Sequence, residues 1–277
     1  MRSSLVGARK EFSLYIELDH IGFGYEPGQA TLSDLSLSIK RGEAVALMGA
    51  NGCGKTTVLS ILSGILSPTA GTFTFDGTPV TSEFLHKPEL VKRFHQRVGS
   101  VFQNSDAQLF CPTVYEEIAF GPQQMGLSDA EIDQRVKDVA QLLDITSLLE
   151  AVPYHLSGGQ KKRIAIGATL AMNPEVLLMD EPMAALDPRT QTFLLGIWQE
   201  LRSAGKTLII ATHDLRMVTD MVDRIVLFSE DHQIVADGTP LEILQQTDLL
   251  KSVNLVDERY HVHVHHHDRE ESVHIHM

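Results

Sequence analysis

The 277-residue sequence predicts an α/β fold with a parallel core sheet, an antiparallel β subdomain and an inserted helical subdomain. Short apolar runs that suit buried strands recur along the chain and alternate with stretches of helical spacing, a pattern typical of parallel sheets. The chain is long enough for one large domain with its own core. Hydrophobic residues make up 43% of it, as in globular rather than disordered proteins.

In the N-terminal half, apolar runs and glycine boundaries predict strands at residues 15–18, 32–39, 44–48, 71–77 and 98–102. The glycines and proline between Gly24 and Gly28 predict a turn between the first two strands. The third strand leads into a glycine-rich loop, and a helix is expected to follow that loop over residues 56–62. The early strands are expected to form the antiparallel subdomain.

The C-terminal half is expected to return to the core sheet after the helical subdomain, which is placed at about residues 104–172. One helix of that subdomain begins near Asp129, because apolar residues recur at helical spacing after it: Ile132, Val136, Val139, Leu142 and Leu143. Strands at 176–179 and 208–212, a helix after Pro188 and a closing hairpin at 225–228 and 233–238 complete the domain. The predicted domain spans residues 13–250, and a low-complexity tail covers residues 257–277.

The loop after the third strand matches G-x-x-x-x-G-K-[ST], in the strand–loop–helix context that confirms such a motif. Glycines let backbone N–H groups face phosphates, and the helix N-terminus adds its positive end. Lys55 is expected to neutralise phosphate charge and Thr56 to ligate Mg²⁺. The motif predicts a P-loop NTPase whose nucleotide contacts come from Gly49, Ala50, Asn51, Gly52, Cys53, Gly54, Lys55, Thr56 and Thr57.

Two carboxylates follow the apolar run of the strand at 176–179. Ligands of open parallel sheets bind at the carboxyl ends of the strands, so Asp180 is placed to hold the metal of a bound nucleotide. Glu181 is placed to polarise the attacking water as a general base. Cys53 lies near a helix N-terminus, where thiols are often acidic, and its alkylation is expected to block ATP binding.

Ser157, Gly158, Gly159 and Gln160 resemble the signature motif of ABC-type ATPases, and the chain continues Lys161 to Gly167 as that family's signature helix does. The resemblance covers roughly residues 13–250. It implies an ATPase with the ABC fold, in which two nucleotide domains dimerise head to tail. Each signature then closes over the ATP held by the other domain. Small residues suit that role because backbone must approach a phosphate closely.

The same resemblance implies roles for single residues elsewhere. Gln103 looks like the glutamine that senses Mg²⁺ and the attacking water, and His213 like the switch histidine that contacts the γ-phosphate. Tyr25 lies where the family places an aromatic ring on adenine, with Phe23 as the alternative. Asp187 ends a loop that resembles the one crossing the dimer interface. The implied catalytic residues are Glu181, His213 and Gln103, and the implied Mg²⁺ ligands are Thr56, Gln103 and Asp180.

Charge and hydropathy narrow the class of protein. The formal net charge of −13 argues against a general affinity for nucleic acid. No apolar run is long enough to span a bilayer, and the N-terminal residues do not resemble a signal peptide. The chain is therefore expected to be a peripheral protein on the cytoplasmic face of the cell (inner) membrane. Cys53 and Cys111 suggest no disulfide framework.

Residues 108–110, Gln-Leu-Phe, and residues 119–122, Ala-Phe-Gly-Pro, look like pieces of the energy-coupling-factor (ECF) importers, a branch of the ABC family. This resemblance implies transmembrane partner subunits and a second ATPase subunit, expected to be an identical copy. The segment after Gln103 would form the groove that receives helices of the membrane partner. Its acidic residues would either pair with arginines there or form a solvated face: Asp106, Glu116 and Glu117.

The tail is rich in histidine: His261, His263, His265, His266, His267, His274 and His276. Neutral imidazole suits Ni²⁺, Co²⁺, Cu²⁺ and Zn²⁺, and alternate histidines of an extended chain share a face. Together with the ECF pieces, the tail resembles the cobalt/nickel branch, which implies ATP hydrolysis driving uptake of one of these ions. The alternatives are an ECF-type vitamin importer with an incidental tail, and a soluble metal-regulated ATPase or metal-storage protein.

Overall fold

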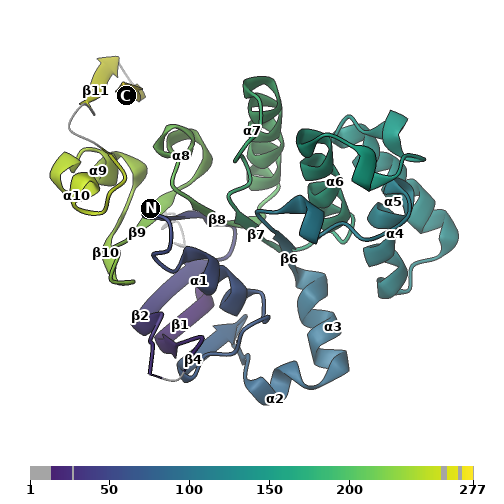
Figure 1. The fold of residues 1–277 in the computed structure, drawn as a ribbon, viewed down its shortest axis with the longest axis horizontal. Helices are drawn as coiled ribbons and strands as arrows, with labels where there is room; N and C mark the ends of the chain where they lie inside the picture. Colours follow the sequence, from purple (N-terminus) through teal and green to yellow (C-terminus); the bar gives the residue numbers. More distant parts are fainter. Residues whose placement is uncertain (1–13, 27, 257–260, 268–269, 277) are drawn as a thin grey trace, which may run out of the picture.

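The computed structural model describes residues 14–26, 28–256, 261–267 and 270–276. They form a mixed core sheet, an antiparallel sheet, a group of helices and a C-terminal hairpin (Figure 1). The strands are β1 (Leu14–Phe23), β2 (Leu32–Lys40), β3 (Ala44–Met48), β4 (Ala70–Phe75), β5 (Thr78–Pro79), β6 (Val98–Val101), β7 (Val176–Asp180), β8 (Thr207–Thr212), β9 (Arg224–Phe228), β10 (Ile234–Gly238), β11 (His261–His267) and β12 (Glu270–His276). The helices are α1 (Lys55–Leu62), α2 (Ser82–Leu85), α3 (Pro88–Arg97), α4 (Val114–Met125), α5 (Asp129–Leu142), α6 (Gly158–Leu170), α7 (Pro188–Ser203), α8 (Leu215–Met221), α9 (Pro240–Leu244) and α10 (Thr247–Ser252).

The core sheet has the strand order β10-β9-β3-β8-β7-β6. All its neighbouring pairs are parallel except the edge pair, in which β10 runs antiparallel to β9. Every residue of β3 is buried because helices or strands cover both faces of this sheet. Ala46 and Met48 pack toward one hydrophobic core, while Val45 and Leu47 pack toward the other.

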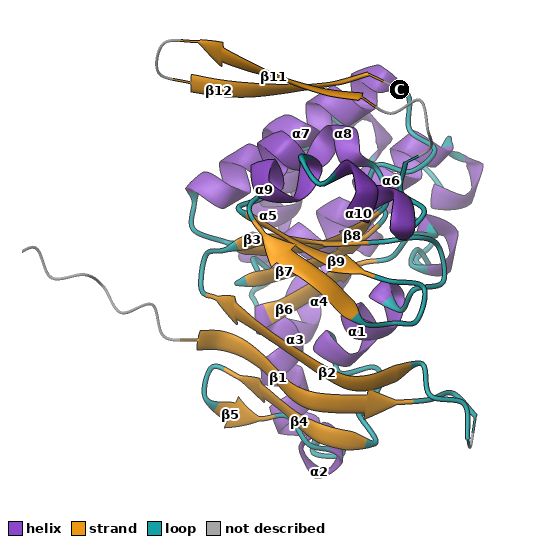
Figure 2. Ribbon diagram, turned by 90° about the vertical axis from the view of Figure 1, so that its left-hand side faces the viewer, coloured by secondary structure: helices purple, strands orange, loops and turns teal. Residues whose placement is uncertain are grey.

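The antiparallel sheet has the order β2-β1-β4-β5 and lies below the core sheet in Figure 2, with α1 between the two. Alternate residues of β1 face the space between the sheets, so Ile16 and Leu18 are buried while Glu17 is exposed. This sheet and the core sheet share one hydrophobic cluster, which positions α1 and the loop before it.

The helical part packs α4 and α5 against α6 at the opposite side of the core sheet (Figure 1). Gly167 of α6 permits this close packing, since a Cβ there would lie about 3.0 Å from Leu143 and 3.1 Å from Val139. Ser128 and Glu131 form a capping box at the start of α5, which fixes where this helix begins.

Several elements lack a strong sequence signal. Helix α3 consists mostly of polar residues and buries only Phe94, and α2 and α10 are shorter still. The hairpin β11–β12 pairs His261 with His276 and His263 with His274. The side chains of the tail and residues 257–260 lie outside the described residues. None of the described helices is both long and apolar enough to cross a bilayer.

Candidate functional site

The phosphate loop joins the buried end of β3 to the N-terminus of α1. Gly49 has φ +151°, and a Cβ at this position would lie 2.7 Å from the carbonyl oxygen of Phe228, so the loop requires glycine here. Lys55 begins α1 and is buried. Its Nζ donates hydrogen bonds to the carbonyl oxygens of Gly49 (2.8 Å) and Ala50 (2.9 Å), which holds the ammonium at the mouth of the loop.

The predicted Mg²⁺ ligands come together beside the loop. Thr56 Oγ1 donates to Asp180 Oδ2 at 2.9 Å, and Gln103 lines the same pocket. Burial raises the pKa of the Asp180 carboxyl, while the hydrogen bond from Thr56 opposes that rise. A hydroxyl, a carboxylate and an amide form an all-oxygen donor set, which is the chemistry that Mg²⁺ prefers. The residues present therefore fit this metal.

The candidate catalytic carboxylate is held between two side chains from the end of β8. Glu181 Oε1 lies 2.6 Å from His213 Nδ1, and Thr212 Oγ1 donates to Glu181 Oε2 at 3.1 Å. Glu181 follows β7 directly and has φ +44°, a left-handed conformation that is costly for a residue with a Cβ. The turn directs a buried carboxylate toward His213 rather than along the strand.

The loop, the candidate Mg²⁺ ligands and Glu181 line one pocket of about 540 Å³, whereas His213 is bonded to Glu181 and does not itself line the pocket. Its lining combines both ends of the loop with the carboxylates: Tyr25, Thr31, Asn51, Gly52, Gly54, Lys55, Thr56, Thr57, Gln103, Asp180, Glu181 and His232. Tyr25 is 63% exposed and donates to or accepts from Thr57 Oγ1 at 3.2 Å, whereas Phe23 is buried and stands edge-on to the Tyr25 ring. The structure thus favours Tyr25 over Phe23 as the aromatic ring that faces a base.

The signature residues do not line this pocket. Ser157 caps α6, and Gln160 closes the capping box from the N3 position, which leaves Gly158 and Gly159 at an open helix N-terminus. A Cβ at Gly158 would meet no described atom within 4 Å. Asp187 caps α7 by accepting from Thr190, and these hydrogen bonds lower the pKa of the Asp187 carboxyl. Neither the signature residues nor Asp187 therefore lines the nucleotide pocket of its own chain.

Thr31 and His232 carry no sequence motif by which they could have been singled out, whereas Thr212 directly precedes the predicted switch histidine His213. Thr212 holds Glu181, and Thr31 and His232 line the pocket. His232 lies in the turn between β9 and β10 with φ +62°, and its Nδ1 has no partner among the described residues. Contact with the phosphate loop depends on the pairing of distant strands, so local sequence does not reveal it.

The acidic residues after Gln103 differ in their surroundings, and only the expectation for Glu117 needs correction. Glu117 does not face a partner, because it is buried and its Oε2 accepts from the backbone N–H groups of Phe110 and Cys111. Asp106 already pairs with Lys161 at 2.6 Å, whereas Glu116 is exposed. Cys53 is only 1% exposed, so its thiol is not open to reagents in this conformation.

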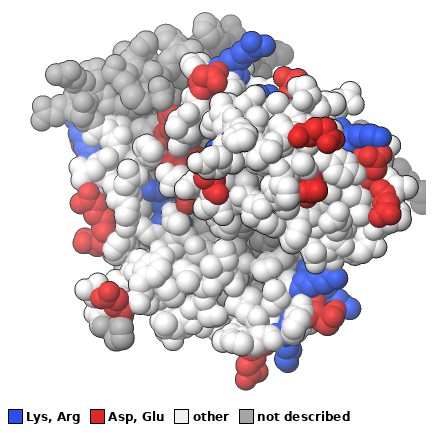
Figure 3. Space-filling model, turned by 45° about the vertical axis from the view of Figure 1, so that its right-hand side comes forward, with Lys and Arg blue, Asp and Glu red and all other residues white. Residues whose placement is uncertain are grey.

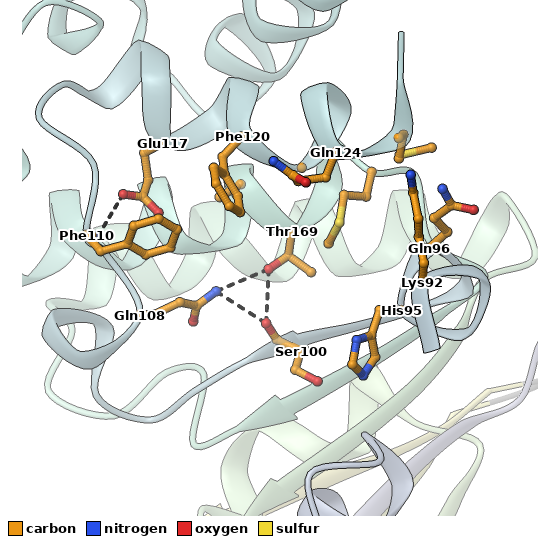
Figure 4. Close-up of a pocket in the computed structure, with 14 residues that line it drawn as sticks. Lys92, His95, Gln96, Ser100, Gln108, Phe110, Glu117, Phe120, Gln124 and Thr169 are labelled. Carbon is orange, nitrogen blue, oxygen red and sulfur yellow. Dashed lines mark hydrogen bonds between the residues drawn. The ribbon is translucent and has the colours of Figure 1, made fainter. Parts of the chain in front are cut away.

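A second pocket, of about 370 Å³, lies between α3, α4 and α6, beside β6 (Figure 4). Phe110 and Phe120 are 67% and 40% exposed, and their rings meet edge to face with centroids 5.0 Å apart. Gln108 forms the floor by donating to Ser100 O and Thr169 Oγ1, each at 3.3 Å. Figure 3 shows a broad uncharged area across one face of the molecule, with charged groups along its margins. The pocket is therefore an apolar groove with exposed aromatic rings.

The loop, the carboxylates and the separate signature helix define an ATP-hydrolysing P-loop protein. A family model described as ABC transporter matches residues 32–184, more than half of the chain, and the chain belongs to this family. Among curated relatives, it is 46% identical to the nickel import ATP-binding protein LarO of Lactiplantibacillus plantarum, covering 83% of this chain and 95% of LarO. It is 40% identical to the energy-coupling factor transporter ATP-binding protein EcfA of Methanothermobacter thermautotrophicus, covering 87% of this chain and 76% of EcfA.

Solved structures agree with this assignment. CbiO1 of Clostridium perfringens, part of the ABC transporter complex CbiONQ, superposes with a TM-score of 0.75 at 34% identity, over 87% of this chain and 95% of CbiO1. The ATP-binding cassette MJ0796, solved as a dimer bound to ADP and Pi, superposes with a TM-score of 0.74 at 28% identity, over 81% of this chain and 98% of MJ0796. The chain is an ATP-binding subunit of an ECF-type ABC importer.

Proposed function

We propose that this subunit hydrolyses ATP on the cytoplasmic face of the membrane to drive uptake of nickel or cobalt ions. The observation that carries the hydrolytic part is the pocket lined by Lys55, the Thr56–Asp180 pair and Glu181, with His213 bonded to Glu181 beside it. The identity to a nickel import ATPase and to CbiO1, together with the histidine-rich tail, supports the choice of metal ions.

In this proposal each group of the pocket has one task. Backbone N–H groups of residues 49–56 and the Lys55 ammonium bind the phosphates, and Tyr25 stacks on adenine. Thr56, Asp180 and Gln103 hold Mg²⁺, which supplies charge neutralisation on the phosphates when bound. Glu181 accepts a proton from the attacking water. His213, held by Glu181, is placed to contact the terminal phosphate.

Two subunits are needed for a complete site. The N-terminus of α6, formed by Ser157, Gly158 and Gly159, is open, and an open helix N-terminus is the kind of site that binds phosphate. These residues nevertheless lie outside the nucleotide pocket of their own chain. We infer that they close over the nucleotide of a second, identical copy, with Gln160 shaping the turn and Asp187 at the interface. Closure around ATP and opening after hydrolysis form a two-state motion that drives transport.

The groove at Phe110 and Phe120 is the proposed contact for the transmembrane subunits. Exposed aromatic rings at a groove whose exposed surface is mostly apolar fit an apolar helix face of a membrane protein. The exposed Glu116, on the same helix as Phe120, would pair with a basic residue of that partner. Glu117 shapes the groove from inside by holding the backbone of Phe110 and Cys111.

The tail is proposed to buffer or sense the transported metal rather than to form the transport path. Its support is the histidine pattern and the backbone register, which pairs His261 with His276 and His263 with His274. Neutral imidazoles at such positions suit Ni²⁺ or Co²⁺. Binding of Ni²⁺ to the whole chain and to a version ending at residue 256 tests this. Equal stoichiometry in the two would contradict a metal-binding tail.

The test of the proposed function is the metal content of cells that carry the native chain or Lys55→Ala, grown with trace Ni²⁺, Co²⁺, Zn²⁺ and Mn²⁺. Lys40→Ala, the same substitution at an exposed lysine of β2, is the matched control. Selective loss of nickel or cobalt in Lys55→Ala alone is expected and identifies the ion. No change in any metal would overturn metal uptake and redirect the search to vitamins.

A further inference from the structure

Lys162 is a buried cation of the signature helix that the proposed chemistry does not use. It lies in the first turns of α6, two residues after Gln160, and only 3% of it is exposed. Its Nζ donates to the carbonyl oxygens of Phe102 (3.0 Å) and Gln103 (2.9 Å), about 60 residues away in sequence. The signature helix is thereby bonded to the backbone of the glutamine that lines the nucleotide pocket of the same chain.

Burial of Lys162 makes the charged form of its side chain unfavourable. Burial lowers the pKa of its ammonium to about 8, and the nearby Asp180 and Glu181 only partly offset this effect. Its hydrogen-bond partners are two neutral carbonyls rather than a carboxylate. An apolar side chain of the same length would avoid the cost of desolvating a charge. The observation that matters for function is the geometry, in which the ammonium of α6 bonds the backbone of residues 102 and 103.

The segment that follows β6 is attached to α6 at further points. Gln108 donates to the carbonyl oxygen of Ala165 at 3.3 Å and accepts from the Phe102 N–H at 3.0 Å. Asp106 pairs with Lys161 of the same helix at 2.6 Å. Residues 102–108 are therefore fastened to α6, and a displacement of the helix would carry the Gln103 backbone with it. Among these contacts, only those of Lys162 reach Gln103 itself.

We propose that Lys162 is a positioning residue that couples the two nucleotide sites of the dimer. Its hydrogen bonds set the place of Gln103 in one site according to the docking of the signature helix on the other. This inference rests on the proposed dimer, in which the N-terminus of α6 meets the nucleotide of the partner copy. Lys162 touches neither nucleotide nor metal and acts through Gln103.

The test compares Lys162→Met, which removes both hydrogen bonds at similar length, with Lys162→Gln, which retains an amide donor. Lys161→Met is the matched control, because it removes a neighbouring lysine of α6 whose ion pair is with Asp106. The readouts on the whole chain are the Kd for ATP, kcat for hydrolysis and the Hill coefficient for ATP. Thermal unfolding of each variant reports whether it folds.

Lys162→Met is expected to bind ATP within about twofold of the native Kd, while kcat falls by about 10-fold to 100-fold, as for a misplaced catalytic group. Its Hill coefficient is expected to fall toward one, Lys162→Gln should recover part of kcat, and Lys161→Met should behave as the native chain. Native kcat and cooperativity in Lys162→Met would overturn the inference. If Lys162→Met does not fold, the test rests on Lys162→Gln. A native kcat and Hill coefficient in Lys162→Gln would then overturn the inference, whereas an intermediate kcat with a reduced Hill coefficient would support it.

The two proposals fail in different ways. A native chain that hydrolyses ATP without cooperativity would contradict the proposed dimer, on which the coupling depends. A cooperative native chain with an equally cooperative Lys162→Met would contradict the role of Lys162 alone. Equal losses of kcat in Lys162→Met and Lys161→Met would attribute the effect to the charge of α6 and would also overturn the specific role of Lys162.

Discussion

Replacing Glu175 with glutamine should weaken the junction between the antiparallel sheet and the core sheet. Glu175 precedes β7 and accepts hydrogen bonds from Arg97 Nε (2.6 Å), Arg41 (2.7 Å) and the Tyr15 hydroxyl (2.6 Å). Arg97 also bonds Asp76 at 2.6 Å, and the Arg41 guanidinium lies 4.0 Å from the centre of the Tyr15 ring. One carboxylate thus bonds side chains from three other segments of the chain.

The pKa of Glu175 gives the magnitude of this effect. Hydrogen bonds from Arg97 are the main cause that lowers it from an ordinary 4.5 to about 2. At about 1.4 kcal/mol for each pKa unit, this difference corresponds to about 3 kcal/mol. Because 37% of the side chain is exposed, solvent screening reduces the contribution to about 1–2 kcal/mol. The carboxylate form is stabilised, so the contribution is present above pH 4.5 and is lost as the pH falls toward about 2.

Urea unfolding of the native chain and Glu175→Gln, at neutral pH and at steps below pH 4.5, measures this contribution. The native chain should be more stable by about 1–2 kcal/mol at neutral pH. The difference should shrink as Glu175 becomes protonated. Glu150→Gln, at an exposed position of the helical part, serves as the control and should change little. An equal midpoint for Glu175→Gln and the native chain at neutral pH, or a deficit that does not depend on pH, would refute the reasoning.

Four further predictions follow from single contacts. Glu181→Gln should bind ATP but lose hydrolysis and accumulate as a closed dimer on size-exclusion chromatography, and normal turnover would contradict its role as the base. Tyr25→Ala should weaken ATP binding by about 1–3 kcal/mol, measured by titration calorimetry, whereas a native Kd would exclude stacking. Gly71→Ala should lower the free energy of unfolding by at least about 2 kcal/mol, because Gly71 has φ +79° and an added Cβ would lie 2.3 Å from a backbone oxygen. The control Gly77→Ala has a similar φ of +72° but its Cβ would meet no atom within 4 Å, so it should cost less. Equal melting temperatures of the two variants would refute the clash. Alkylation of the buried Cys53 should be slow by mass spectrometry, slower still with Mg²⁺-ATP, and should abolish ATP binding; unchanged nucleotide affinity of the modified chain would contradict this.

Much of the nucleotide site follows from local sequence, because its chemistry needs fixed residue types at fixed spacing. The phosphate loop, Asp180–Glu181 and His213 each sit at the end of a buried apolar run, and parallel strands bring their carboxyl ends to one edge. The prediction of separate strands at these runs is confirmed, with boundaries that differ by at most one residue. Helix α3 was not predicted, although Leu90, Val91 and Phe94 have helical spacing, because most of its residues are polar.

The neighbours of each side chain were decided by packing across the fold. Glu117 has the sequence context of an exposed acidic residue, yet the turn before α4 brings two backbone N–H groups to its carboxylate. The resemblance favoured Tyr25 as the ring on adenine and left Phe23 as the alternative, and the burial of Phe23 leaves Tyr25 as the one of the two that lines the pocket. Such outcomes depend on contacts between distant segments, which residue type alone does not specify.

The sequence alone determined that the protein uses ATP, to which family it belongs, and which strands lead into the phosphate loop, Asp180–Glu181 and His213. It could do so because phosphate binding and hydrolysis constrain short segments of backbone and side chain. Tertiary structure alone decided that Thr212 and His213 hold Glu181, that His232 borders the nucleotide pocket, and that Lys162 reaches the Gln103 backbone. The physical reason is that hydrogen bonds between side chains act over about 3 Å, and only the packed sheet and helices bring residues so far apart in the chain within that distance.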